Sequence, residues 1–157
     1  MNLSEHLTLE QFTKSQTATR NNILEQFNPP AELIEAGKEW AENIWEKLIL
    51  LFPDLSLSSG YRSPALNKAI GGANSSQHTK MEAGDLESLK AGNIEIAKTV
   101  LKAGIIFDQM IIEFGTMEKP AWIHLSYKKT GNRGQILRAS GTPTIYTVLT
   151  KEQILNL

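Results

Sequence analysis

One stretch of the chain gathers side chains that can do chemistry. Residues 58–85 hold Arg62, His78 and Asp85 among turn-forming and small residues. A further histidine, His124, follows in the segment AWIHLSY. Zinc takes imidazole nitrogen and carboxylate oxygen as ligands at about 2.0–2.2 Å, and two histidines with one carboxylate leave a position for water, which is typical of catalytic sites. The chain has no cysteine, so the thiolate sites of most structural zinc proteins are excluded.

Each of these residues also has an ordinary explanation. A lone histidine is most often a surface or hydrogen-bonded residue. Arg62 alone fits a solvated corner, and Asp85 alone fits a turn or a helix cap. His6, which lies just before the first expected helix, is interpreted in this way, as a structural or incidental residue. The hypothesis of a metal site therefore depends on the ordered set and not on any single member.

The local sequence predicts how Arg62 is presented. Residues 55–58 alternate apolar and polar side chains, which suits a short half-buried strand. Ser63 is a good helix N-cap and Pro64 is favoured at the first helical position, so we expect a helix over residues 64–69. Arg62 then lies at a strand-to-helix corner, where a side chain can be held over a cleft.

The segment that joins His78 to Asp85 allows two conformations. The spacing of seven residues would place both side chains on one face of a helix. Gly84 and the polar residues 73–77 favour a loop followed by a strand instead. We expect the loop and the strand.

The ordered motifs resemble the M15 zinc peptidases. They are SGYRSPALN, then the spacing SxHxxxxAxD over residues 76–85, then WIH. This family includes D-Ala-D-Ala carboxypeptidases and phage cell-wall endopeptidases. The resemblance extends from LTLEQFTKSQTA near the start to about Tyr127. The family usually has glycine where this chain has Met81, a departure that concerns the local turn or strand packing rather than the ligands.

The resemblance implies a role for each member of the set. By it, His78, Asp85 and His124 look like the ligands of one zinc ion. Arg62 looks like the residue that contacts a substrate carboxylate or the developing oxyanion. The planar guanidinium suits that role because it can grip a carboxylate with two hydrogen bonds.

The catalytic base is also assigned through the resemblance. Many members carry an acidic residue three positions before the last histidine, where this chain has Ala121. In phage-type members and the related hedgehog signalling domain, a glutamate ends the strand that begins with a Phe-Asp pair. Glu113 matches that position in FDQMIIE, and Glu118 in the following loop is the alternative. Such a glutamate takes a proton from water and returns it to the leaving amine, whereas the ordinary explanation is that Glu113 pairs with a lysine at the rim.

Helical patterns predict the frame around these residues. A long helix is expected over Ala31–Leu51, with apolar residues recurring at three- and four-residue steps. Trp40 and Trp45 on this helix are interpreted as packing residues rather than as ligand platforms. A second amphipathic helix is expected to begin with Asn93 as its cap. Short capped helices are also expected after Thr8 and Thr150.

Strand patterns complete the frame. Phe107–Glu113 and Ala121–Tyr127 are expected as central antiparallel strands. In the second of them Trp122 shares a face with His124, which makes Trp122 a candidate wall of the pocket. We expect a further edge strand at Gln135–Arg138 and a short strand at Tyr146–Leu149, and the sequence indicates no role for the tail after Ala139.

Composition and length limit the class of protein. The 157 residues suffice for one domain, residues 1–157, and 41% hydrophobic and 21% charged residues are ordinary for a globular protein. The net charge of −1 argues against nucleic acid as a partner. The longest apolar run, Leu48–Phe52, is too short to span a membrane. The first residues lack the basic start and apolar run of a signal peptide, so we expect synthesis in the cytoplasm. For an enzyme that acts on the cell wall, the resemblance to the M15 peptidases then implies release by phage lysis or carriage on a virion.

Together these observations predict a single α+β domain: a small, mainly antiparallel sheet with helices packed on one side, like hedgehog and D-Ala-D-Ala peptidase domains. The expected activity is zinc-dependent hydrolysis of peptidoglycan stem peptides, by a carboxypeptidase or an endolysin-type endopeptidase, with one zinc ion and a monomeric chain. Two alternatives remain open on the same fold. One is a zinc-bearing binding module without catalysis, and the other is a structural phage protein.

Overall fold

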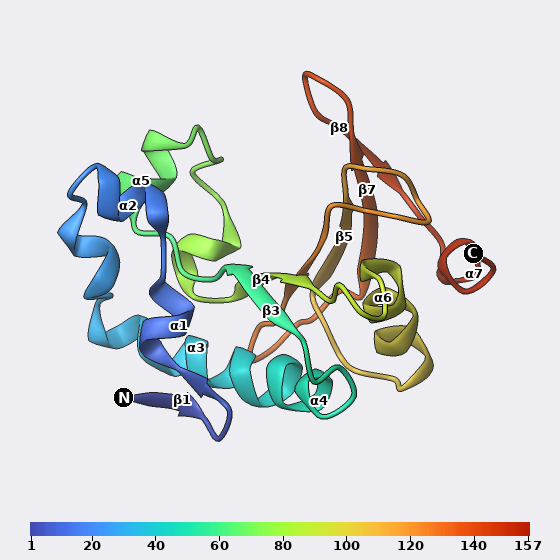
Figure 1. Ribbon diagram of the computed structural model, residues 1–157, viewed down its shortest axis with the longest axis horizontal. Helices are drawn as coiled ribbons and strands as arrows, with labels where there is room; N and C mark the ends of the chain where they lie inside the picture. Colours follow the sequence, from blue (N-terminus) through green and yellow to red (C-terminus); the bar gives the residue numbers. More distant parts are fainter.

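A six-stranded sheet forms the centre of the computed structural model, which describes residues 1–157 (Figure 1). Its strand order is β3-β4-β6-β5-β7-β8, and all neighbours are antiparallel except β5 and β7, which are parallel. A separate antiparallel pair, β1 and β2, lies at the N-terminus. The strands are β1 (Asn2–Ser4), β2 (Leu7–Thr8), β3 (Ser56–Ser59), β4 (Ala83–Glu87), β5 (Gln109–Glu113), β6 (Trp122–Ser126), β7 (Gln135–Ser140) and β8 (Ile145–Val148).

The α+β class is confirmed, but the prediction of a small, mainly antiparallel sheet was wrong. The main sheet is large and mixed because β7, expected at an edge, lies inside it between β5 and β8. The loop over residues 127–134 carries the chain from β6 past β5, and β7 then pairs in parallel with β5. Hydrophobic alternation predicts that a segment is a strand, but it does not say which neighbour that strand joins.

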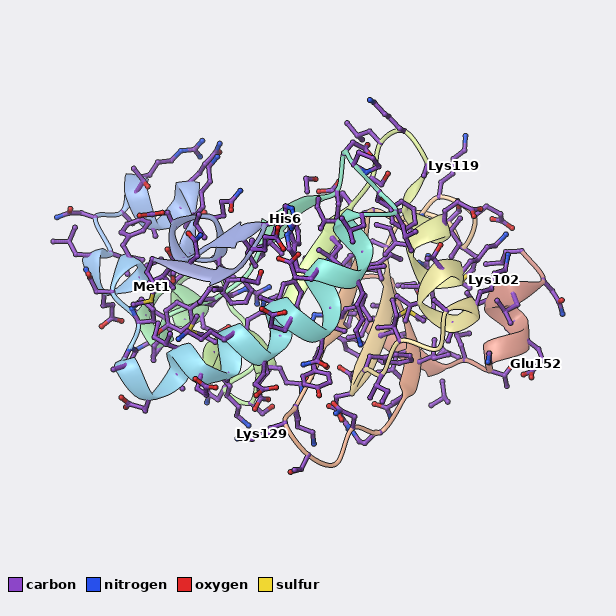
Figure 2. The ribbon with its side chains drawn as sticks, turned by 90° about the horizontal axis from the view of Figure 1, so that it is seen from below. Met1, His6, Lys102, Lys119, Lys129 and Glu152 are labelled. Carbon is purple, nitrogen blue, oxygen red and sulfur yellow. The ribbon has the colours of Figure 1, made fainter.

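Short helices surround the sheet, and one long helix lies along the molecule (Figure 2). That helix consists of α3, the π-helical η2 and α4 in unbroken succession, so the predicted helix is confirmed up to Ile49. The helices are α1 (Leu9–Thr13), α2 (Gln16–Arg20), η1 (Leu24–Phe27), α3 (Ala31–Trp40), η2 (Ala41–Trp45), α4 (Glu46–Ile49), α5 (Pro64–Ala69), η3 (Gln77–Lys80), α6 (Asn93–Lys102) and α7 (Lys151–Leu155).

The long helix and α6 pack against one face of the sheet. Trp40 is fully buried, and its Nε1 donates a hydrogen bond to the carbonyl oxygen of Leu125 in β6 at 2.9 Å. Gly84 in β4 faces the same tryptophan, since a Cβ there would lie 2.5 Å from the Trp40 ring. Trp45 is also buried, which confirms that both tryptophans are packing residues. The opposite face of the sheet is left for the polar side chains of the site.

The local sequence correctly predicted three of the four helix N-caps considered. Thr8, Ser63 and Thr150 each accept a hydrogen bond from the backbone of the first turn, as expected. The prediction that Asn93 caps α6 was wrong, because Gly92 is the cap and Asn93 is the first helical residue. The Asn93 side chain instead bridges the backbone N–H of residue 88 and the carbonyl oxygens of residues 120 and 121. None of these helices has the length and apolar character needed to cross a membrane.

Candidate metal centre

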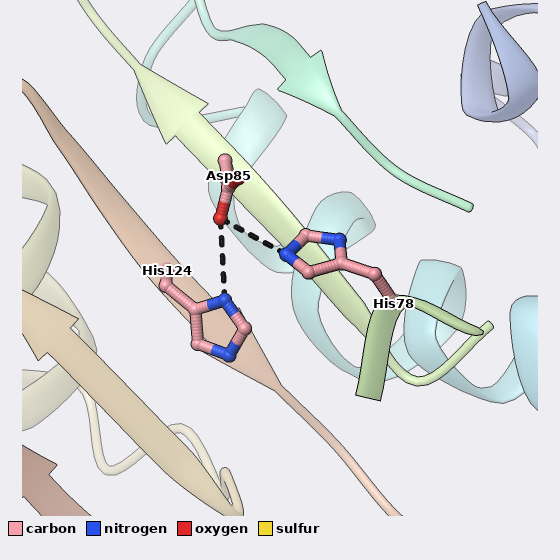
Figure 3. Close-up of side chains that lie close together, drawn as sticks. All are labelled: His78, Asp85 and His124. Carbon is pink, nitrogen blue, oxygen red and sulfur yellow. Dashed lines mark hydrogen bonds and ion pairs between the residues drawn. The ribbon is translucent and has the colours of Figure 1, made fainter. Parts of the chain in front are cut away.

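Three side chains from different elements meet on the open face of the sheet (Figure 3). His78 comes from η3, Asp85 from β4 and His124 from β6. Asp85 Oδ1 lies 3.3 Å from His78 Nε2 and 3.2 Å from His124 Nδ1. All three side chains are buried. The structure therefore brings together the three residues expected from the sequence, and each offers one ligand atom to a common point.

Strand pairing places two of these residues. Asp85 and His124 are direct partners in the antiparallel ladder of β4 and β6, so their side chains point to the same face. The loop-and-strand prediction for the segment before Asp85 is thus confirmed, with η3 as one turn of 3₁₀ helix ahead of β4. His78 reaches the site through this turn, whose Ser76 Oγ accepts from the His78 backbone N–H at 3.3 Å.

Met81 ends that turn in a left-handed conformation, with φ 58° and ψ 28°. Glycine adopts this conformation with little strain, which gives a physical reason for the glycine noted above at this position of the M15 pattern. The chain keeps methionine, whose side chain is fully buried against Gly37 of α3. The departure noted in the sequence therefore changes the packing behind the turn and leaves His78 in place.

The hydrogen bonds of the histidines are compatible with metal binding. His78 Nδ1 lies 2.7 Å from the carbonyl oxygen of Gly60, so Nδ1 carries a hydrogen and Nε2 is the ring nitrogen that faces Asp85. Nε2 and Asp85 Oδ1 lie 3.3 Å apart, a separation that either a shared proton or a metal ion can bridge. Two ligand atoms of one tetrahedral site lie about 3.3–3.6 Å apart when their metal bonds measure about 2.0–2.2 Å. The donor set and its spacing therefore fit a zinc ion.

The surroundings of Asp85 strongly favour its ionised form. Burial alone would raise the pKa of this carboxyl group. The charges and hydrogen bonds of His78 and His124 outweigh burial and hold the pKa of Asp85 well below its usual range. The carboxylate is thus available as an anionic ligand throughout the neutral range.

Arg62 lies where the corner prediction placed it. It follows β3 and precedes α5, and its backbone N–H donates to the carbonyl oxygen of His78 at 3.1 Å. The guanidinium Nη2 is 3.5 Å from Asp85 Oδ2, and Nε donates to Ser59 Oγ at 3.3 Å. Its side chain is only 18% exposed. The arginine is therefore held beside the three ligand candidates with part of its guanidinium still open to a ligand.

Glu113 ends β5 on the same face of the sheet. It pairs in register with Trp122, two residues from His124 in β6. Burial, together with the charge of Asp85, raises the pKa of Glu113 to about 7, against smaller opposing effects of nearby cationic groups. Glu118 is exposed in the following loop and does not line the cleft that contains Glu113. Of the two glutamates considered, only Glu113 lies in that cleft.

A cleft of about 810 Å³ contains these groups. The three ligand candidates, Arg62 and Glu113 all line it, and so does Trp122, as predicted for a residue on the face of His124. Trp122 stacks edge-on against Phe114, with ring centroids 5.6 Å apart. A second cavity of about 680 Å³ shares Arg62, Asp85 and Trp122 with the first. Arg62 therefore borders both cavities.

Two groups of cleft residues were missed from the sequence. The first is a fully buried carboxylate, Asp108, that accepts two hydrogen bonds from the Arg133 guanidinium and one from Gln77 Nε2 at 2.9 Å. This ties the loop after β6 to the turn that carries His78. The Phe-Asp pair marked the start of a strand, but nothing in the pattern indicated its partners. The second group comprises Leu137 and Tyr146 in the C-terminal strands.

His6 lies outside this centre, next to the long helix (Figure 2). Its Nδ1 is 2.7 Å from Glu46 Oε2, and its carbonyl oxygen accepts from Trp45 Nε1 at 3.0 Å. With Glu5 it forms a second, exposed group of acidic and imidazole side chains. The contacts agree with the interpretation of His6 as a structural residue that ties the first hairpin to the helix.

A histidine-aspartate-histidine centre with a glutamate and an arginine in one cleft is an arrangement suited to a metallopeptidase. The chain belongs to the peptidase M15 family, since the family model described as Peptidase M15 matches residues 5–126. Members of this family are generally zinc-dependent. A search of curated proteins gives no match to the chain. The match includes every residue of the candidate centre and ends at the last residue of β6.

Proposed function

We propose that the protein is a zinc peptidase that hydrolyses peptide bonds in the stem peptides of peptidoglycan. The observation that carries the proposal is the convergence of His78, Asp85 and His124 beside Glu113 and Arg62 in one cleft. The family membership supports a peptidase, and the donor set supports zinc. The hedgehog resemblance stays a prediction.

In this proposal the three ligand candidates hold one zinc ion. A zinc ion held there would supply a Lewis acid for the scissile carbonyl and for the attacking water. The Gly60 carbonyl oxygen fixes the tautomer of His78, and strand pairing fixes His124 against Asp85. These supports keep the ligand atoms in place before the ion binds.

Glu113 acts as the general base and then as the general acid. Its raised pKa, about 7, allows it to take and return a proton near neutral pH. Arg62 holds a substrate carboxylate or the developing oxyanion, for which it has a partly exposed guanidinium next to the ligands. The assignment differs from the arrangement with an acid three positions before the last histidine, where this chain has Ala121.

The test measures release of D-alanine and of new amino groups from purified peptidoglycan. Native protein, chelator-treated protein, zinc-restored protein and Glu113→Gln are compared, with Glu118→Gln as the matched control. We expect cleavage that is lost with chelation, returns with zinc, is lost in Glu113→Gln and persists in Glu118→Gln. D-alanine would identify a carboxypeptidase, and new amino termini without it an endopeptidase. Tight zinc binding without cleavage of several wall types would refute the proposal and favour a binding module.

The proposed site of action is the cell wall, reached after release from the cytoplasm by phage lysis or on a virion. Fractionation of producing cells before and after lysis tests this part separately. Wall-bound protein before lysis would contradict it.

A further inference from the structure

The loop over residues 127–134, which joins β6 to β7, carries two cationic side chains into the cleft. Lys128 and Arg133 both line it, and both lie outside the segment that matches the family model, which ends at residue 126. The loop protrudes from the molecule in Figure 2, where its residue Lys129 is labelled. Neither cationic residue has a role in the proposed hydrolysis. We call Lys128 and Arg133 the basic corner.

Hydrogen bonds close this loop and hold it against the start of β5. Asn132 Oδ1 accepts from the Lys128 backbone N–H at 2.8 Å, and Asn132 Nδ2 donates to the Lys128 carbonyl oxygen at 2.7 Å. The backbone N–H groups of residues 134–135 donate to the carbonyl oxygens of residues 107–108, each at 3.0 Å. The two cationic residues therefore extend from a loop that is fixed at both ends.

The buried carboxylate of Asp108 orients Arg133. It accepts hydrogen bonds from Arg133 Nε at 3.0 Å and Nη2 at 2.8 Å, and from the Arg133 backbone N–H at 3.0 Å. A guanidinium has five N–H donors, and this pair uses two of them. The Arg133 side chain is 51% exposed, so the remaining donors are accessible to a further anion. The arginine is thus held in one orientation before a ligand arrives, which lowers the entropic cost of binding.

The basic corner carries more positive than negative charge. Lys128 Nζ lies 3.5 Å from Asp108 Oδ1, and the lysine side chain is 35% exposed. Two cationic groups therefore surround one carboxylate. Lys80 and Glu82 line the same cleft and add one charge of each sign, so the balance of these five groups stays positive. A site of this charge attracts an anion, and the planar guanidinium suits a carboxylate.

The basic corner lies beside the candidate metal centre. Gln77, which precedes the ligand candidate His78, donates to Asp108 Oδ2 at 2.9 Å. Along the chain, Asp108 comes three residues before Ile111, the direct partner of His124 in the sheet. Three residues of strand measure about 10 Å. An extended peptide covers this distance in about three residues. A peptide with its scissile bond at the centre would therefore bring its second or third residue to the corner.

Arg62 has a different place in the cleft. It borders both cavities, whereas Lys128 and Arg133 line the first and not the second. In the proposed function Arg62 holds a carboxylate of the leaving part or the developing oxyanion. The basic corner is therefore left for the part of the peptide that precedes the scissile bond.

We propose that the basic corner binds a free carboxylate in the second or third residue before the scissile bond, so that the protein prefers anionic stem peptides to their amidated forms. This inference rests on the proposed function, because the substrate peptide is the ligand. Lys128 and Arg133 are specificity-determining residues in this arrangement, and they take no part in proton transfer. A stem peptide can carry such a carboxylate on its glutamyl residue or on diaminopimelate, and selective amidation distinguishes the two.

The test compares three synthetic peptides. The first, acetyl-L-Ala-D-γ-Glu-L-Lys-D-Ala-D-Ala, has a free α-carboxylate on its glutamyl residue. The second has an amide in place of that carboxylate, and the third is the amidated peptide with meso-diaminopimelate in place of lysine. Binding is measured by calorimetry with zinc-loaded Glu113→Gln protein, alone and combined with Lys128→Gln or Arg133→Gln. Lys129→Gln is the matched control, because Lys129 is exposed in the same loop and does not line the cleft.

We expect at least one of the two carboxylate peptides to bind about fivefold more tightly than the amidated lysine peptide, the equivalent of ~1 kcal/mol. Lys128→Gln should reduce this preference to about twofold and Arg133→Gln should abolish it, whereas Lys129→Gln should keep it. The amidated lysine peptide should bind all variants equally. Arg133→Gln leaves Asp108 without its partner and lowers stability, but Lys128→Gln keeps the pair and tests the proposal in an intact fold.

Three results would overturn the proposal. The first is equal binding of all three peptides to the zinc-loaded protein. The second is a preference that Lys128→Gln and Lys129→Gln lower by the same factor, because a general effect of charge explains it. The third is a loss that is equal for all three peptides in Lys128→Gln, which would assign the lysine a structural role.

The two proposals fail in different ways. Absence of zinc-dependent hydrolysis, with a carboxylate preference that depends on Lys128, would refute the peptidase and leave the basic corner. Hydrolysis that depends on zinc and Glu113, with the same kcat/KM for the free and the amidated peptides, would refute the basic corner and leave the peptidase.

Discussion

Replacement of Glu113 by glutamine should change how the stability of the metal-free protein depends on pH. Burial raises the pKa of Glu113 from 4.5 to about 7, so between these values the folded protein binds a proton that the unfolded chain does not. The contribution of the protonated group to stability is fully present below pH 4.5 and is lost as pH rises through about 7. Glutamine is neutral at every pH and lacks this loss.

The expected change in the free energy of unfolding follows from the pKa shift of Glu113. About 2.5 pKa units at 1.36 kcal/mol each give ~3 kcal/mol as an upper limit. Glu113 is only partly buried, so solvent screening reduces this to about 2 kcal/mol. For a chain of this size the change corresponds to a shift in melting temperature of about 4–8 °C.

Urea unfolding in the presence of a chelator measures the effect at several values between pH 4.5 and pH 7.5. The free energy of unfolding of Glu113→Gln should rise relative to that of the native protein by about 2 kcal/mol across this range. Glu118→Gln corrects for the loss of one carboxylate, since that residue is exposed and outside the cleft. Parallel curves for native protein and Glu113→Gln would show that Glu113 is not held in a desolvated, anionic environment, and would contradict its role as a base with a raised pKa.

Three further predictions concern the centre and its support. His78→Ala should abolish binding of one equivalent of zinc, measured by metal analysis after dialysis, whereas His6→Ala should retain it; the reverse result would move the metal to the exposed group at His6. Gly84→Ala should destabilise the protein by about 1–3 kcal/mol in thermal unfolding, because its Cβ would lie 2.5 Å from the Trp40 ring, and an unchanged melting temperature would contradict the packing described. Asp108→Asn should lower the free energy of unfolding by about 2 kcal/mol at neutral pH. Burial raises the pKa of Asp108, but its hydrogen bonds with Arg133 and Gln77 have the larger effect and hold the pKa below 3.8. This difference should shrink progressively as pH falls below 3.8 and be lost only as pH passes the lower pKa of the folded state. A difference that stays constant in acid would refute the assignment to charge.

The local conformation around Arg62, His78 and Asp85 could be predicted from the sequence because its signals are local, whereas the ligand set with His124 was implied by the resemblance to the M15 peptidases. Arg62 follows a short strand and precedes a capped helix, and the spacing of His78 and Asp85 is carried by one loop and one strand. The recurrence of apolar residues likewise indicated the long helix and the burial of Trp40. In each case the residues that determine the conformation lie within a few positions of the residue concerned.

The parts that could not be predicted depend on contacts between distant segments. A strand at Gln135–Arg138 was predicted, but its parallel pairing with β5 depends on the path of the preceding loop. Asn93 has the right chemistry for a helix cap, yet carbonyl groups from residues 120 and 121 compete for its side chain. Tyr146 gave no functional signal because its place in the cleft follows from that unforeseen pairing.

The pairing of Asp85 with His124 has a consequence for folding. If β4 slipped by one residue against β6, the carboxylate would turn to the other face, and a side chain would replace Gly84 against the Trp40 ring, where no space exists. The close packing of Gly84 against Trp40 thus fixes the register of β4 against β6. The relative position of Asp85 and His124 is therefore determined by hydrophobic packing on the opposite face of the sheet.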